Sequence, residues 1–279
     1  MSARSIRKTY PGMAVLEGAG VQLTRIFSQP DVEELDPFLL LDFFDSDNPD
    51  DYKRGFPWHP HRGIETITYL IEGEIAHEDS LGNKGTIQAM GCQWMTAGRS
   101  IIHQEMPNSK ARILGAQLWL NLPRAHKMTE PAYRDIQAKD LTIVEDDETH
   151  VKIIAGTYKG KRGPVSGTYV DPFYLDVRVH AGGRFKMDIA TEENVFLLML
   201  EGKMQFPDGT HADIAETCGV LLSDGDTVEV QSKLGARFLL IAGKPLKEPI
   251  AWGGPIVMNS QEELRTAFRE IQEGNFIKE

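Results

Sequence analysis

Short apolar runs that alternate with polar residues recur along most of the chain. They are rich in Val, Ile, Leu, Phe and Tyr, and Gly, Asp and Asn separate them. The clearest runs are 21–27, 65–73, 112–122, 151–158, 173–180, 195–206, 226–231 and 236–243. Alternation at a period of two is typical of strands with one buried face, and closely spaced turns favour antiparallel pairing over βαβ units. The pattern predicts an all-β protein, either a sandwich or a barrel.

Only one segment, 259–274, has the period of a long helix. Its apolar residues at helical spacing are Leu264, Ala267, Phe268 and Ile271. Asn259 or Ser260 can cap its start, and Gly274 ends it. We expect a C-terminal helix over 260–273 that packs one apolar stripe on a sheet and has a structural role.

The strand pattern occurs twice. Three ordered pairs of segments resemble each other at offsets near 127: 68–75 with 197–204, 97–100 with 224–227, and 110–118 with 235–243. A polar segment, 133–142, ends the first copy. We therefore expect two β domains, 1–137 and 138–279, with the helix in the second.

Composition narrows the class of protein. The chain has 279 residues, 41% of them hydrophobic, and a formal net charge of -11, which argues against direct nucleic-acid binding. No apolar stretch approaches the roughly 20 residues of a membrane span. Cys92 and Cys218 lie far apart without a CxxC motif, which is typical of a reducing compartment. We expect a cytoplasmic protein that does not bind membranes.

Two pairs of polar residues suit a metal site. His59 and His61 lie two apart, as do His103 and Glu105, and side chains two apart on a strand share a face. Two neighbouring strands would then present three imidazoles and one carboxylate to a divalent transition metal. Four ligands on an octahedral ion leave two positions open, which is typical of a reactive site. Glu65 shares the parity of the first pair and is the alternative carboxylate; we prefer it as a group that orients an imidazole.

Longer motifs surround these residues. The segments HPHRGIETITYLIEGEIAHEDSLGNKGTI and WMTAGRSIIHQEMP, with GGPIVMN near the C-terminus, closely resemble the pirin family of the cupin superfamily. The resemblance implies a bicupin, two antiparallel jelly-roll barrels, with iron in the N-terminal one. The family's ligands fall on His59, His61, His103 and Glu105, which decides against Glu65 as a ligand.

The second copy lacks this set of ligands. Carried forward by the repeat offsets, the candidate positions become Asp188, Ala190, Asn194, Val230 and Ser232. We therefore expect the C-terminal barrel to be metal-free.

The resemblance implies two kinds of function. The leading one is a dioxygenase that opens a flavonol such as quercetin with O2, using Fe(II), with Mn, Ni, Cu or Zn as other possible metals. Glu105 would act as a base. Expected pocket walls are Phe56, Trp58, Met90 and Trp94, with Arg62 and Gln117 as polar neighbours of the site. The alternative is a metal- or redox-sensing regulator that binds a transcription factor or a metabolic enzyme.

Overall fold

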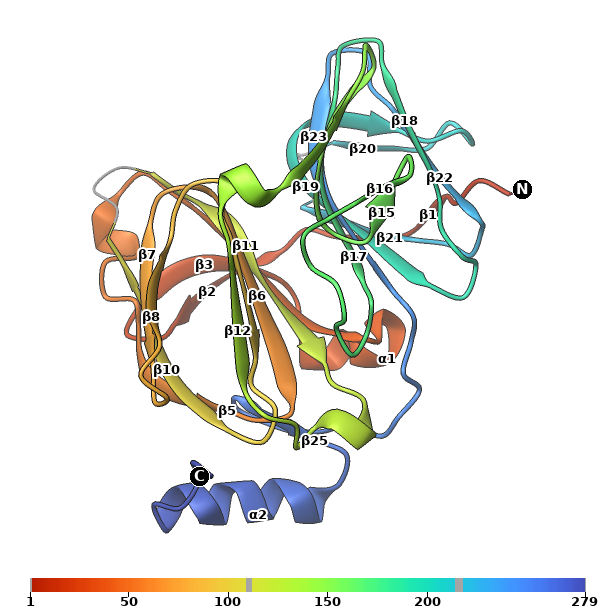
Figure 1. Ribbon diagram of the computed structural model, residues 1–279. Helices are drawn as coiled ribbons and strands as arrows, with labels where there is room; N and C mark the ends of the chain where they lie inside the picture. Colours follow the sequence, from red (N-terminus) through yellow and green to blue (C-terminus); the bar gives the residue numbers. More distant parts are fainter. Residues whose placement is uncertain (1, 109–111, 214–217, 279) are drawn as a thin grey trace. The chain divides into compact units, whose positions relative to one another are not determined.

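The computed structural model describes residues 2–108, 112–213 and 218–278. The chain divides into two compact units (Figure 1). The first barrel, as we call it, consists of Met13–Lys139 and Leu246–Glu279; the second barrel consists of Met1–Gly12 and Asp140–Pro245. Each is described by itself below.

The first barrel is built from two antiparallel sheets. Its large sheet has the order β12-β9-β6-β11-β4-β3-β2, and its small sheet has the order β5-β10-β7-β8. The strands of the large sheet are β2 (Met13–Glu17), β3 (Val21–Phe27), β4 (Phe38–Ser46), β6 (Ile64–Glu72), β9 (Cys92–Thr96), β11 (Ile113–Asn121) and β12 (Ala132–Ile136). Those of the small sheet are β5 (Phe56–His61), β7 (Ile75–Asp79), β8 (Lys84–Ile87) and β10 (Ile101–Pro107). Buried residues from both sheets, such as Leu70 and Ile75, share one apolar cluster, so the core lies between them.

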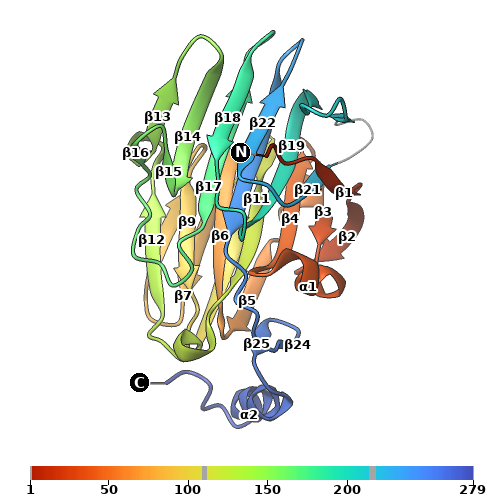
Figure 2. The same cartoon turned by 90° about the vertical axis from the view of Figure 1, so that its right-hand side faces the viewer.

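The C-terminal segment returns to the first barrel. The hairpin β24 (Ala251–Gly253) and β25 (Ile256–Met258) leads into α2 (Gln261–Gln272), which lies next to that hairpin (Figure 2). The Ser260 hydroxyl accepts a hydrogen bond from the Glu263 amide, which caps the helix as the sequence predicts. The short α1 (Val32–Leu35) precedes β4. No helix within the described ranges is both long and apolar enough to cross a bilayer.

The second barrel repeats this arrangement. Its large sheet has the order β1-β21-β19-β23-β17-β14-β13, and β18, β22 and β20 join it through β19. The strands are β1 (Ile6–Tyr10), β13 (Thr142–Glu145), β14 (Thr149–Ala155), β17 (Phe173–Val179), β18 (Arg184–Asp188), β19 (Asn194–Gln205), β20 (His211–Asp213), β21 (Gly219–Leu222), β22 (Thr227–Gln231) and β23 (Ala236–Gly243), with a separate hairpin of β15 (Thr157–Tyr158) and β16 (Lys161–Arg162). The two large sheets match strand by strand, which confirms the bicupin fold that the resemblance implies.

Both ends of the chain depart from the expected division at residue 137. Strand β1 forms the edge of the second barrel by pairing with β21, the position that β12 takes in the first. The predicted helix belongs to the first barrel rather than the second, because its buried residues pack with those of β24 and β25. The apolar periodicity predicted that one face of this helix would be buried. The period alone does not indicate which barrel the helix packs on.

Candidate metal site

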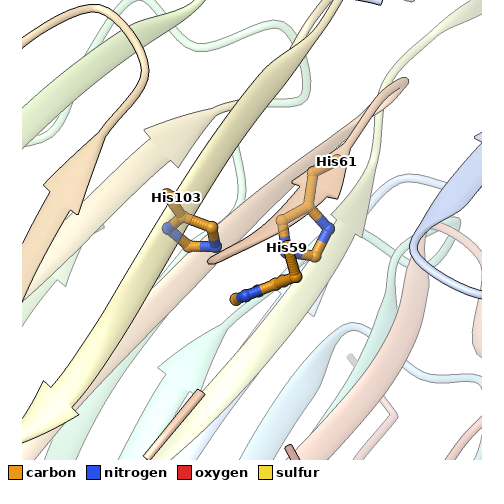
Figure 3. Close-up of side chains that lie close together, drawn as sticks. All are labelled: His59, His61 and His103. Atoms are coloured by element: carbon orange, nitrogen blue, oxygen red, sulfur yellow. The ribbon is translucent and has the colours of Figure 1, made fainter. Parts of the chain in front are cut away.

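Three histidines converge on two paired strands of the small sheet. His59 and His61 lie on β5, and His103 lies on β10 directly opposite His59. Strand β5 is the edge of its sheet, a position that suits Pro60, which has no amide hydrogen to donate. One ligand atom from each ring lies within 4.8 Å of the others, and Figure 3 shows the three rings facing a common space.

Backbone carbonyls orient two of the rings. Nδ1 of His59 lies 2.9 Å from the carbonyl oxygen of Pro57, and Nδ1 of His61 lies 3.2 Å from that of Pro255. A carbonyl oxygen only accepts, so each Nδ1 carries the hydrogen and donates it. The lone pair of each Nε2 is then free to bind a metal.

His103 is the most informative of the three. Its Nδ1 lies 3.4 Å from the Tyr133 hydroxyl, while its Nε2 is buried without a hydrogen-bond partner among the described residues. An unpartnered polar atom in a buried site destabilises the fold. A divalent cation between the three rings would bind this nitrogen, so the residues present fit a metal.

Burial also fixes the charge of two of the imidazoles. The pKa of His61 lies well below its usual value because the ring is buried, and the nearby His59 ring lowers it further. The pKa of His103 is lowered in the same way, by burial and then by the other imidazoles. Both rings are therefore neutral at pH 7, the form that binds a metal.

Glu105 lies outside this group of three ligand atoms. It is buried on β10, and its carboxylate accepts hydrogen bonds from Gln117 Nε2 at 3.0 and 3.1 Å and from Thr68 Oγ1 at 3.2 Å. Thr68 and Gln117 face each other on β6 and β11, so the carboxylate reaches across the barrel to the large sheet. Its partners are neutral donors, and a nearby cation would compensate the buried charge.

A cavity of about 660 Å³ opens beside the histidines. Its walls come from the large sheet, from β5 and from the C-terminal segment. They comprise Glu17, Gly18, Ala19, Arg25, Ser28, Gln29, Leu40, Asp42, Phe56, Pro57, His59, His61, Gln117, Trp119, Trp252, Gly254 and Pro255. The centroids of the Trp119 and Trp252 rings are 5.9 Å apart. The His61 and Trp119 rings meet edge to face. Arg25 makes two hydrogen bonds to Asp42 and one to Glu17, so acceptors on the wall already hold its guanidinium.

Two of the expected pocket residues line this cavity. Gln117 does so from β11, and Phe56 does so because the pairing of β5 with β10 slips by one residue between His59 and Phe56. This bulge brings Phe56 to the same face as the histidines.

The other expected walls need correction. Trp58 points away from its neighbour His59 and is 48% exposed. Trp94 is fully buried on β9, and Met90 lies in the preceding turn with its sulfur 3.6 Å from the Tyr69 hydroxyl. Strand β9 and this turn lie on the far side of β6 from β11, so neither side chain lines the cavity.

Two expected polar neighbours of the site also lie elsewhere. Arg62 is buried and pairs with Glu270 of α2 at 2.7 Å instead of facing the cavity. Glu65 is separated from the histidines by Gly63, where the chain leaves β5 with a φ of 78°. Its carboxylate accepts a hydrogen bond from Thr96 at 2.6 Å, and burial raises its pKa. It does not orient an imidazole.

Sequence reasoning missed several residues of the site. Trp119 follows Gln117 by two residues on β11, so strand parity would have placed it on the cavity wall. Tyr133 and Trp252 carried no signal, because they reach the site through tertiary packing of distant segments. Pro255 lies in the GGPIVMN motif, but the motif alone did not connect it with His61.

Comparisons with known proteins find relatives that match most of this chain. Residues 20–120 match the family described as Pirin, and residues 174–277 match the Pirin C-terminal cupin domain. A pirin-like protein of Caulobacter vibrioides is 42% identical, over 99% of this chain and 100% of that protein. Pirin of Homo sapiens is 38% identical, over 92% of this chain and 90% of that protein. The crystal structure of quercetin 2,3-dioxygenase from Acinetobacter baumannii superposes with a TM-score of 0.90 at 30% identity, over 99% of each chain.

Proposed function

Since the chain belongs to the pirin family, we propose that it is a metal-dependent dioxygenase that opens the ring of a flavonol such as quercetin with O2. The observation that carries the proposal is the group His59, His61 and His103 beside a cavity of about 660 Å³ with aromatic walls. Cavities of roughly 300–1,000 Å³ suit small organic ligands. The solved relative named quercetin 2,3-dioxygenase supports the choice of substrate.

The three imidazoles would hold one divalent metal. We propose Fe(II), with Mn, Ni, Cu and Zn as the competitors that the same donors accept. Glu105 is the proposed fourth ligand and the proposed base. When bound, the metal supplies Lewis acidity that lowers the pKa of a hydroxyl on the substrate. Elemental analysis of freshly purified protein tests the choice of metal.

The chain's own residues would position the substrate and accept its proton. Trp119, Trp252 and Phe56 offer flat apolar surfaces that suit an aromatic ring system and exclude water. An oxygen of the Glu105 carboxylate would accept the proton of a substrate hydroxyl. Gln117 Nε2, which donates to both carboxylate oxygens, holds that group in place until then.

The test is oxygen-dependent loss of quercetin absorbance. The unsubstituted protein should consume quercetin under air and not under nitrogen. His103→Ala removes the buried Nε2 and should lower both metal content and turnover at least 100-fold. His211→Ala, an exposed histidine of the second barrel, is the matched control and should change neither. Full turnover by the His103→Ala variant would refute the proposed site.

A further inference from the structure

The chain just after His61 is bonded to the C-terminal segment, residues 251–278. Arg62 forms a parallel bridge with Ile256, and the Val257 amide donates to the Arg62 carbonyl oxygen at 3.1 Å. Lys127 is buried there, and its Nζ donates to the carbonyl oxygens of Gly63 at 2.8 Å and Val257 at 2.9 Å. One ammonium group therefore connects the end of the histidine-bearing strand to β25.

The side chain of Arg62 makes a second attachment. It is 2% exposed, and its Nη2 lies 2.7 Å from the Glu270 carboxylate of α2 and 3.3 Å from the carbonyl oxygen of Phe276. Its guanidinium also lies over the Phe276 ring, 4.4 Å from the centroid, and its Nε donates to the Arg99 carbonyl oxygen. A buried arginine with all these partners fixes the position of the neighbouring backbone.

The same segment reaches the metal ligands directly. The Pro255 carbonyl oxygen accepts the hydrogen bond from His61 Nδ1, and Trp252, Gly254 and Pro255 line the cavity. A hydrogen bond to the distal nitrogen of a ligating imidazole fixes its tautomer and orientation. The orientation of the His61 ring thus depends on Pro255, which lies 194 positions further along the chain.

We infer that the C-terminal segment is a positioning element of the metal centre, which holds His61 in the tautomer and orientation that bind the ion. The inference rests on the metal site of the proposed function but not on its substrate. Because coupling is reciprocal, loosening the segment weakens metal binding, and metal binding tightens the segment.

The experiment loosens the segment at a distance from the histidines. Phe276→Ala, Glu270→Gln and the double variant remove partners of Arg62. Arg265→Ala, an exposed residue of α2, controls for changes to the helix surface. Ile87→Ala, in the separate apolar cluster between the sheets, controls for general loss of stability. The probe is Co²⁺ alone, with affinity measured by competition against a chelator and without substrate.

We expect the double variant to bind Co²⁺ at least about 10-fold more weakly than the unsubstituted protein. Losses of this size are typical when the groups that hold a metal ligand in place are removed. Both controls should bind within twofold of the unsubstituted protein. In metal-free protein, nitrogen NMR of the imidazoles should show His61 with its hydrogen on Nδ1, and this preference should be lost in the double variant.

Hydrogen exchange gives the reciprocal measurement. Addition of Co²⁺ should slow exchange of the Val257 amide and of the α2 amides in the unsubstituted protein. Unchanged Co²⁺ affinity in the double variant, or exchange that Co²⁺ leaves unaltered, overturns the inference. If the protein binds Co²⁺ as expected but no metal form consumes quercetin, the proposed function fails and this inference stands.

Discussion

At the scale of single residues, the groups that contact the three imidazoles determine how each ring is oriented. His103 has one nitrogen facing the other imidazoles and the other near the Tyr133 hydroxyl. The Tyr133 ring stacks on His77, with an interplanar angle of 13°, and burial raises the pKa of its phenol, which stays protonated. The hydroxyl is thus held in a defined place from which to orient His103.

Tyr133→Phe tests this orientation. The variant keeps the ring and its stacking but removes the hydroxyl, so we expect metal affinity to fall about 10-fold with little change in stability. Co²⁺ competition gives the affinity, and thermal unfolding gives the stability. Tyr158→Phe, which removes a buried hydroxyl in the second barrel, should leave the affinity unchanged. Equal affinities for the two variants would contradict the role given to Tyr133.

The lowered pKa values of His61 and His103 predict how stability depends on pH. The metal-free folded chain keeps both rings neutral below pH 6.5, whereas the unfolded chain protonates them. The unfolded state therefore binds more protons, and the free energy of unfolding falls as pH decreases from 7 to 5.5. Each ring contributes up to roughly 1 kcal/mol per pH unit.

Urea unfolding followed by tryptophan fluorescence measures this dependence in the first barrel alone, because Trp58, Trp94, Trp119 and Trp252 all lie there. His103→Gln should show a smaller dependence on pH than the unsubstituted metal-free protein. If the free energy of unfolding depended on pH equally in both proteins, His103 would not contribute to that dependence.

At the scale of elements, alternation and turn residues predicted most strands. The expected run at 21–27 is β3, that at 236–243 is β23, and the other six overlap strands to within a few residues. The pair His59 and His61 and the pair His103 and Glu105 also fall on two neighbouring strands, as expected. Strand parity alone would have placed Phe56 on the face opposite the histidines, but a bulge shifts the register. Parity also counted Glu65 with the histidines, but Gly63 interrupts the strand. Such local irregularities depend on backbone packing that a period-two pattern does not contain.

Gly63 packs tightly against the backbone of the C-terminal segment. A Cβ atom there would lie 2.0 Å from the Val257 carbonyl oxygen, and its φ of 78° favours glycine. Gly63→Ala should lower the free energy of unfolding of the first barrel by at least 2 kcal/mol. Gly82→Ala is a suitable comparison, since its φ is also positive but no atom lies within 4 Å of the added carbon. Urea unfolding should show a larger loss for Gly63→Ala.

At the scale of the whole molecule, one sheet order serves two barrels with different interiors. In the second barrel, Phe185 faces Val230 across β18 and β22, as His59 faces His103 in the first. Met187 then corresponds to His61, and all three are buried in the apolar core. Strand pairing thus shifts the expected equivalents of His59 and His61 from 188 and 190 to 185 and 187. The repeat was readable from sequence, but its offset drifts because loop lengths differ.

Phe185→Ala tests whether the two barrels are separate in function. Removing this buried ring should cost the second barrel about 3–5 kcal/mol. Because the residue belongs to the other unit, Co²⁺ affinity and the tryptophan unfolding curve of the first barrel should stay unchanged. A drop in metal affinity comparable to that of Tyr133→Phe would show that the barrels are coupled.

The return of the C-terminus to the first barrel has a consequence for biosynthesis. Residues 13–139 leave the ribosome long before Trp252, Pro255 and Phe276 are translated, so the nascent barrel emerges with one wall of its cavity missing and His61 without its acceptor. We expect a metal to bind in the geometry of the folded site only after the C-terminal segment has been translated. A stalled nascent chain that ends before residue 251 would bind the ion more weakly than the released protein.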